Sequence, residues 1–335
     1  MPEPASPEWL YEDGIGEARA ALVENDEIVE VLIEPEGTEP RAGAVVEGRL
    51  TAIAIPARRG FVTLADATEV LVEPLLREWT QGAKVRIEIV REAVAERDRA
   101  KRAKGRPAPE GDLVDGPTLR QRIGATGTPV RVPGLHDADA LEAAGWSELI
   151  ENAQAGAWAF TGGTLRISLT PAMTLIDVDG HLPLAELALA AATAVGRAIR
   201  AYGLAGSIGV DFPTLGGKDA RIAIAAAFDA VLPLPFERTA VNGFGFMQVI
   251  RPRTRASLIE HLITDTAGHA ARALLRGVER EGRTGAVTLV ARPQVVAVLE
   301  QHPDWLDRLA RHLGGAIGLR GDATMAMAGC YAEPA

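Results

Sequence analysis

The sequence contains a single cysteine, Cys330, and it lacks long uninterrupted apolar runs. One thiol cannot form an internal disulfide or supply the cysteine ligands of a structural zinc site, so we expect no zinc. The apolar runs stop well short of the roughly 18 residues that a membrane-spanning helix needs. The first residues also lack the basic and then apolar layout of a signal peptide, so we expect a cytoplasmic protein that does not contact a membrane.

Positive charge is also in short supply. The chain has 35 Lys and Arg against 45 Asp and Glu, a formal net charge of −10. This balance argues against binding nucleic acid through overall charge, because phosphate affinity comes largely from Lys and Arg. Local clusters remain: residues 97–106 are mostly basic, which is typical of a solvated loop, and Arg251, Arg253 and Arg255 alternate, which puts them on one side of an extended segment.

Two short apolar runs, in contrast, carry carboxylates. Residues 173–180 include Asp177 and Asp179, and residues 207–212 include Asp211. Runs of β-forming residues bounded by Gly predict buried strands, and the intervening residues 184–202 predict a helix. A strand–helix–strand unit sets its two strand ends side by side, so we expect the three carboxylates to converge.

Converging carboxylates repel one another unless a cation or a shared proton compensates. A hard divalent ion with oxygen ligands, Mg²⁺ or alternatively Mn²⁺, is the economical solution. The plain alternative is that each Asp caps the helix after its strand, because Asp is a favoured N-cap residue. A metal-dependent phosphatase of small substrates would use the same acids.

The overall pattern predicts a multidomain α/β (α+β) fold. We expect disorder over residues 1–8, strands over 9–42, and, inserted in this N-terminal mixed subdomain, a small barrel of the oligonucleotide-binding type over 43–104, where several short strands follow one another. The rest of the chain is predicted to form a linker at 105–116, a mixed segment at 117–165, an α/β catalytic domain at 166–256 and a small C-terminal α+β domain at 257–335.

The predicted barrel has one candidate RNA-binding aromatic. Barrels of this type bind single strands through exposed aromatic and basic side chains, and Phe61, preceded by Arg58 and Arg59, suits such a surface. Spacing alone fits Phe61 in the barrel core equally well.

Three stretches together resemble the ribonuclease E/G family. Residues 9–28 are similar to that family's N-terminus and lead, as there, into a barrel of the S1 type. Residues 162–165 together with 172–179 are similar to its first catalytic strand, and residues 206–212 are similar to the second. The segment GFGFMQVIRPR at 243–253 is similar to the stretch that closes its active site.

The resemblance implies a Mg²⁺-dependent endoribonuclease that cleaves single-stranded RNA and leaves 5′-phosphate and 3′-hydroxyl ends. By position, Asp177 and Asp211 match the metal ligands, and Asp179 falls where the family has an Asn that orients the phosphate or the water. Phe61 matches an aromatic of the S1 surface, and Arg251 or Arg253 would add an electrostatic clamp on the phosphate. Residues 117–165 correspond to a reduced ribonuclease-H-like remnant.

The same resemblance leaves two features open. The family's cysteine pair, which links subunits through zinc, is absent, so a homodimer would be held by packing alone. The acidic and basic residues that flank the first catalytic strand in the family are also replaced, by residues 168–171. A relative that binds RNA without cleaving it is therefore the alternative to an active enzyme.

Overall fold

The computed structural model describes residues 6–38, 40–96, 100–135 and 137–335. The chain forms two compact units, each built from separate stretches of sequence. The first contains Met1–Gly37, Thr126–Ser147 and His261–Ala335, and the second contains Thr38–Ala125 and Glu148–Glu260. Most of the segment predicted to be disordered lies outside the described residues, and Glu8 already begins the first strand.

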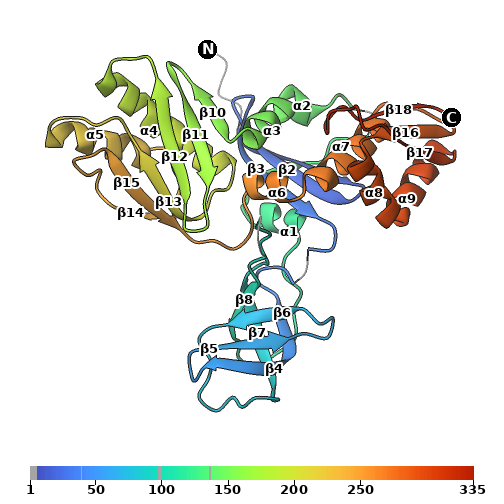
Figure 1. Ribbon diagram of the computed structural model, residues 1–335, viewed down its shortest axis with the longest axis horizontal. Helices are drawn as coiled ribbons and strands as arrows, with labels where there is room; N and C mark the ends of the chain where they lie inside the picture. The colour runs from blue at the N-terminus through green and yellow to red at the C-terminus, as the bar shows by residue number, and fades with distance from the viewer. Residues whose placement is uncertain (1–5, 39, 97–99, 136) are drawn as a thin grey trace. The chain divides into compact units, whose positions relative to one another are not determined.

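The first unit starts with an antiparallel meander of three strands. A short fourth strand pairs in parallel with β1, which gives the sheet order β3-β2-β1-β9. The strands are β1 (Glu8–Gly14), β2 (Glu17–Glu24), β3 (Glu27–Pro35) and β9 (Val130–Arg131). The chain leaves this sheet after β3 and returns to it at β9, so the barrel between them is inserted in an N-terminal mixed subdomain, as predicted (Figure 1).

The C-terminal part of the first unit is a three-stranded sheet, order β17-β16-β18, with helices packed on it. Its core joins Leu275 of α7, Leu299 of α8 and Leu309 of α9 to strand β16. The elements are α7 (Thr266–Arg280), β16 (Val287–Ala291), α8 (Pro293–Gln301), α9 (Pro303–Leu313), β17 (Ile317–Gly321) and β18 (Tyr331–Pro334).

A buried network of charges ties helix α7 to the N-terminal hairpin. Arg272, Arg276 and Arg280 recur every four residues and share one face of the helix. Glu17 accepts a hydrogen bond from Arg272 Nε at 2.8 Å, and Glu12 accepts one from Arg280 Nη1 at 3.0 Å. Arg276 contacts both glutamates, at 3.4 and 3.5 Å. The N-terminal and C-terminal ends of the chain therefore share one folded unit.

The second unit contains a closed barrel with the strand order β4-β5-β6-β8-β7. Leu50, Val62, Val70, Ile87 and Ile89 point inward and are fully buried. The strands are β4 (Val45–Ile55), β5 (Arg59–Thr63), β6 (Glu69–Val72), β7 (Lys84–Arg91) and β8 (Ala103–Pro107). Strand β8 continues past the expected end of the barrel at residue 104, so the end of the basic run belongs to the barrel wall.

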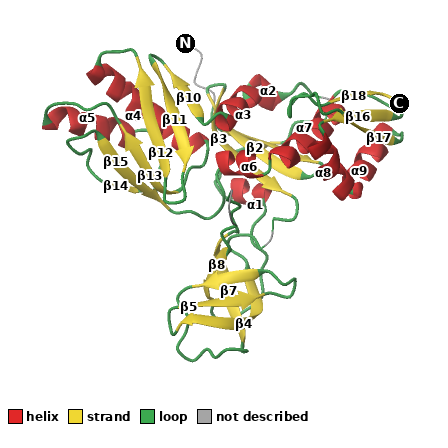
Figure 2. Ribbon diagram, in the orientation of Figure 1, coloured by secondary structure: helices red, strands yellow, loops and turns green. Residues whose placement is uncertain are grey.

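The remainder of the second unit is a six-stranded sheet, order β10-β11-β12-β13-β15-β14. Helix α4 packs against β10, β11 and β12, and α5 packs against α4 (Figure 2). The elements are β10 (Ala157–Phe160), β11 (Gly163–Leu169), β12 (Thr174–Gly180), α4 (Leu184–Ala201), β13 (Gly206–Asp211), α5 (Lys218–Asp229), β14 (Glu237–Arg238) and β15 (Phe246–Arg251). Short helices complete the chain: α1 (Leu119–Gly124), α2 (Ala140–Ala143), α3 (Trp146–Gln154) and α6 (Leu258–Thr264).

The two faces of this sheet differ in character. Because side chains alternate along a strand, Ile176, Ile208, Val210 and Val249 share one face and are buried. The buried face of α4 is rich in alanine, which lets the helix approach the strands closely. The alternate residues of the same strands form the other face, which we call the open face because it carries exposed side chains, among them Leu175 and Ile250.

Candidate functional site

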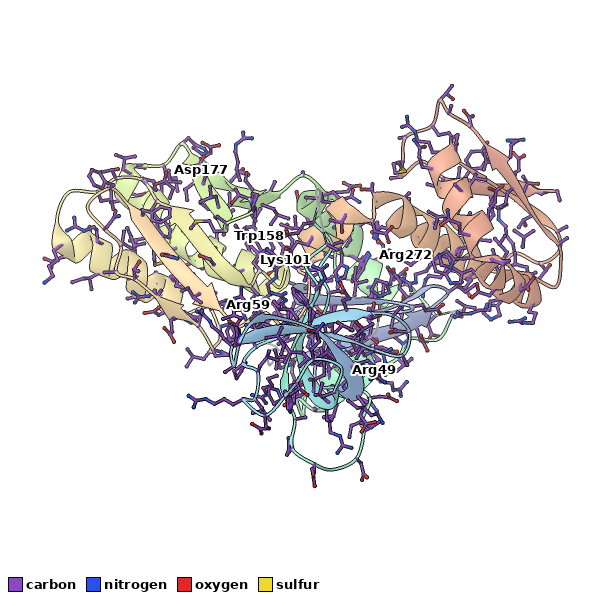
Figure 3. The ribbon with its side chains drawn as sticks, turned by 60° about the horizontal axis from the view of Figure 1, so that its bottom comes forward. Arg49, Arg59, Lys101, Trp158, Asp177 and Arg272 are labelled. Carbon is purple, nitrogen blue, oxygen red and sulfur yellow. The ribbon has the colours of Figure 1, made fainter. Side chains whose placement is uncertain are left out.

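Asp177 and Asp211 lie side by side on the open face. Strands β12 and β13 are parallel, and Asp177 is the direct register partner of Asp211. Neighbouring strands are about 4.8 Å apart, and residues in register project to the same face. Asp211 ends β13, whereas Asp177 lies within β12, so the sheet brings together two of the three acids that the sequence singled out (Figure 3 labels Asp177).

Asp179 has a different partner. Its Oδ2 accepts a hydrogen bond of 2.6 Å from Nε of Arg166 on strand β11, and both side chains are largely exposed. Arg166 is also the cross-strand partner of Asp177 in the β11–β12 hairpin. The hydrogen bond that Arg166 donates to Asp179, followed by the negative charge of Asp179 and then of Asp177, raises the pKa of the Arg166 guanidinium. Arg166 therefore places a cation beside the carboxylates of Asp177 and Asp179 on the open face.

The acid pair has the chemistry that a magnesium ion needs. Mg²⁺ is commonly bound by one or two carboxylates and completes its octahedron with waters and substrate phosphate oxygens. Asp177 and Asp211 supply two such carboxylates on a surface that solvent reaches. Within the described residues, no group of three or more His, Cys, Asp or Glu side chains is placed to hold a metal ion. The predicted convergence thus holds for two acids, and Asp179 pairs with Arg166 instead.

An apolar surface adjoins the acids on the open face. Gly209 pairs with Leu175, two residues before the acid pair on both strands and therefore on the same face. A Cβ atom at Gly209 would come within 2.6 Å of Cζ of Phe246 and within 3.1 Å of Sδ of Met173. The absence of a side chain at this position lets the Phe246 ring lie against the strand, and Phe246 is itself the register partner of Asp211.

The alternating arginines lie elsewhere. Arg251 alternates with Ile250 on β15 and therefore lies on the helix-covered face, where its Nη1 donates to the carbonyl oxygen of Leu204 at 3.1 Å. Arg253 forms an ion pair with Glu260. Arg255 is half-buried. Their predicted role in binding RNA stays a prediction, and Arg166 is the cation that the structure places beside the acids.

On the barrel, Phe61 belongs to the outer surface and not to the core. Gly60 and Val62 point inward, so Phe61 points outward. Its register partner is Leu71, whose own partner on the next strand is Lys104. The guanidinium of Arg102 lies 5.3 Å from the centre of the Phe61 ring. An aromatic ring, an aliphatic side chain and two cations therefore share one outer patch.

Glu73 organises the cations next to this patch. Arg59 and Lys104 each contact its carboxylate at 3.2 Å, and Arg58 does so at 3.5 Å. The hydrogen bond from Lys104, ahead of the one from Arg59, lowers the pKa of Glu73. Arg58 is largely exposed, so its side chain is accessible to a ligand. Its neighbour Arg59 is labelled in Figure 3.

Sequence reasoning did not single out Arg166, Arg102 or Lys104 as site residues. A signal for Arg166 was present, because Thr164, Arg166 and Ser168 alternate on a strand that forms a hairpin with the acidic one. Identifying it required the register of the hairpin, which the spacing of apolar residues does not supply. Arg102 and Lys104 lie in the basic run that was interpreted as a loop.

The chain is similar in part to ribonuclease G. Over 115 residues it is 33% identical to ribonuclease G of Escherichia coli (strain K12) and of Shigella flexneri, a stretch that covers 31% of this chain and 23% of each relative. Ribonuclease G of Salmonella typhimurium (strain SL1344) is 31% identical with the same coverage. The chain thus matches less than a quarter of the length of these curated relatives. No protein-family model matches it.

Within the described residues, no helix combines the length and the apolar character that crossing a bilayer demands.

Proposed function

We propose that this protein is an endoribonuclease that uses Mg²⁺ to hydrolyse single-stranded RNA. The observation that carries the proposal is the register pairing of Asp177 with Asp211 on the open face of the sheet. The partial similarity to ribonuclease G supports RNA as the substrate class. Mn²⁺ has similar ligand preferences and would substitute.

Asp177 and Asp211 would hold the ion, and Arg166 would bind the substrate. When bound there, Mg²⁺ supplies a Lewis acid that activates water and offsets charge on the phosphate. Arg166 would donate hydrogen bonds to a non-bridging phosphate oxygen, since its guanidinium lies across the hairpin from Asp177 and is largely exposed. Asp179 would orient Arg166 through their hydrogen bond.

The net reaction adds water across one P–O3′ bond. The oxygen of water becomes part of the 5′-phosphate of one fragment, and the O3′ atom leaves and takes up a proton as the 3′-hydroxyl of the other. Charge accumulates on the phosphate oxygens as the bond breaks, and a cation fixed beside them before the reaction stabilises that charge most effectively.

The barrel patch around Phe61 would bind the same RNA at a second point, in addition to the cleavage site. Base–aromatic stacking is tolerant of sequence but needs an unpaired base, and Arg102 and Lys104 add attraction for phosphates. Arg58 and Arg59 would extend this contact. A homodimer is part of the proposal only as an assembly formed by packing.

Asp211→Asn tests the proposal. The amide keeps the shape of the side chain but removes the charge that would hold the ion, so cleavage of a labelled single-stranded RNA in Mg²⁺ should fall by at least about 10²-fold, the range seen when a group that stabilises the transition state is removed. Asp219→Asn, an equal change at an exposed acid on α5, is the control and should cleave normally. Equal cleavage by wild type and Asp211→Asn would disprove the assigned site.

A second candidate is an RNA-binding relative without catalytic activity. It is favoured because, within the described residues, no group of three or more His, Cys, Asp or Glu side chains is placed to hold a metal ion. Tight binding of the same RNA by wild type, without product over a range of Mg²⁺ and Mn²⁺ concentrations, would support this candidate over the enzyme.

A further inference from the structure

Phe244 is the most exposed large hydrophobic side chain among the described residues, with 82% of its surface accessible to solvent. It lies in the turn that leads into β15, whose first residue, Phe246, pairs with Asp211. The backbone N–H of Phe212, the residue after Asp211, donates to the carbonyl oxygen of Gly245 at 3.2 Å. The exposed ring is thus presented by a turn bonded to the end of the strand that carries Asp211.

This turn is held in one conformation by its own hydrogen bonds. The side-chain oxygen of Asn242 accepts from the N–H groups of Phe244 and Phe246, at 2.9 and 3.0 Å. The hydroxyl of Thr214 donates to the carbonyl oxygen of Phe244 at 3.0 Å. Gly245 has φ of +91°, and a Cβ atom there would lie 2.2 Å from the carbonyl oxygen of Phe212. Hydrogen bonds, and not burial of the ring, therefore fix the backbone of Phe244.

An aromatic ring held out in water beside a phosphate-binding site suits one ligand chemistry well. Fully burying a Phe side chain contributes about 1.5–3 kcal/mol, so leaving the ring exposed forgoes that stabilisation. A nucleobase offers a flat apolar face that can cover the ring, and every base has such a face. Since successive nucleotides in a single strand are joined through phosphates, a base next to the cleaved phosphate lies within the neighbourhood of this turn.

We propose that Phe244 is a positioning residue that stacks on the nucleobase adjoining the scissile phosphate; the inference rests on the proposed ribonuclease activity. A base held against Phe244 cannot at the same time stack within a duplex. The selection of single-stranded RNA would then be made at the cleavage site itself, in addition to any binding by the barrel. Phe246, whose ring lies against Gly209, would form the floor beside it.

The kinetic test compares three variants. Phe244→Ala should raise KM by about tenfold, in line with alanine substitution of stacking aromatics. Phe244→Tyr retains a ring and should restore the wild-type value. Leu234→Ala removes another strongly exposed apolar side chain of the same unit, 78% accessible, and should leave KM unchanged. Wild-type kinetics in Phe244→Ala would overturn the inference without affecting the proposed function.

A substrate with a single abasic nucleotide, placed on either side of the scissile phosphate, separates stacking from a general structural role. Wild type should lose cleavage efficiency on one of the two abasic substrates by about the same factor as Phe244→Ala loses on normal RNA. Phe244→Ala should be indifferent to that abasic position. If the loss caused by the abasic nucleotide and the loss caused by Phe244→Ala multiply when the two changes are combined, the ring and the base act independently, which contradicts stacking.

A fluorescence measurement decides the inference even if the protein does not cleave RNA. RNA with 2-aminopurine at the same two positions is titrated with the Asp211→Asn variant, which is expected to bind without turnover. Stacking should quench the fluorescence at one position, and the additional Phe244→Ala change should abolish that quenching. Quenching that persists, or an altered oligomeric state in Phe244→Ala with unchanged quenching, would assign the ring to another partner and overturn the inference.

Discussion

Arg166 offsets the negative charge of Asp179. By itself, a third carboxylate next to the acid pair would repel a phosphate. The hydrogen bond of 2.6 Å from Arg166 to Asp179 supplies a compensating positive charge on the same face. The spacing of acids along the chain predicted that Asp177 and Asp211 would meet, since both lie on strands that flank one helix. It could not predict Arg166, because the cross-strand partner depends on hairpin register.

Substitution of Arg166 should lower the catalytic efficiency on RNA without lowering the stability of the fold. Arg166→Gln should lower kcat/KM for RNA by about 10²-fold if the guanidinium stabilises charge on the phosphate, while Arg166→Lys should lower it less. The free energy of unfolding should stay close to that of the wild type, because the pair with Asp179 is exposed and solvent screens it.

Asp179→Asn is the matched variant for this experiment, and it should have a smaller effect than Arg166→Gln. Steady-state kinetics and urea denaturation of the same preparations would measure both quantities. A large loss of stability in Arg166→Gln with unchanged kinetics would show that the residue is structural only.

Among the elements, helix α7 has a role that its position near the C-terminal end does not suggest. Its three arginines are spaced to reach Glu12 and Glu17 on the N-terminal hairpin. Burial, followed by repulsion from Arg276, lowers the pKa of the nearby Arg19 to about 10, and Glu12 opposes this shift through its charge and hydrogen bond. The network therefore depends on a balance of charges away from water.

Glu17→Gln should disturb this balance strongly. The Glu17 side chain is 3% exposed and contacts both Arg272 and Arg276, so its neutralisation removes a buried carboxylate from both guanidinium groups and leaves Arg272 with Asp265 and Arg276 with Glu12. We expect a loss of about 3–5 kcal/mol in the free energy of unfolding. Glu8→Gln, which breaks an exposed pair with Arg131, should cost no more than about 1 kcal/mol. Denaturant unfolding monitored by circular dichroism would reveal the difference, and equal losses would refute it.

Local sequence signals predicted a single element well where one continuous pattern marks it. The predicted helix over residues 184–202 matches α4 within one residue, since a long apolar pattern marks it. Within the predicted C-terminal domain, α8 and α9 are separate helices, because Pro303 lacks the N–H group that a continuous helix would need and instead begins α9. Periodicity detects an apolar face and does not detect the break.

At the scale of the whole molecule, the order of segments along the chain differs from their grouping in space. The predicted small C-terminal domain and the N-terminal strands form one unit, which no local pattern indicates. Strands β10 and β11 likewise belong to the sheet of the acid pair, although most of their residues precede residue 166, where we expected that domain to begin. Pairing between distant segments depends on complementary charge and shape, which a single sequence does not display.

The barrel should fold as an isolated fragment, whereas the N-terminal meander should not. The barrel core is built entirely from residues between Ala44 and Ala103, so a fragment of residues 41–117 retains it. The meander without α7 would leave Glu12 and Glu17 without the arginines. Circular dichroism with thermal melting should show a cooperative transition for the first fragment and none for residues 6–37. A barrel fragment without a transition would contradict this expectation.

The link between Glu17 and Arg272 spans 255 positions of sequence. A ribosome produces the N-terminal hairpin first, yet the cation that neutralises Glu17 is synthesised only after the barrel and the six-stranded sheet are complete. Glu17 therefore acquires its partners Arg272 and Arg276 only after α7 has been synthesised. Until then, Glu12 has Arg19 as a partner within the hairpin, whereas Glu17 lacks Arg272 and Arg276, so the charge network of the hairpin is completed only when α7 packs on it.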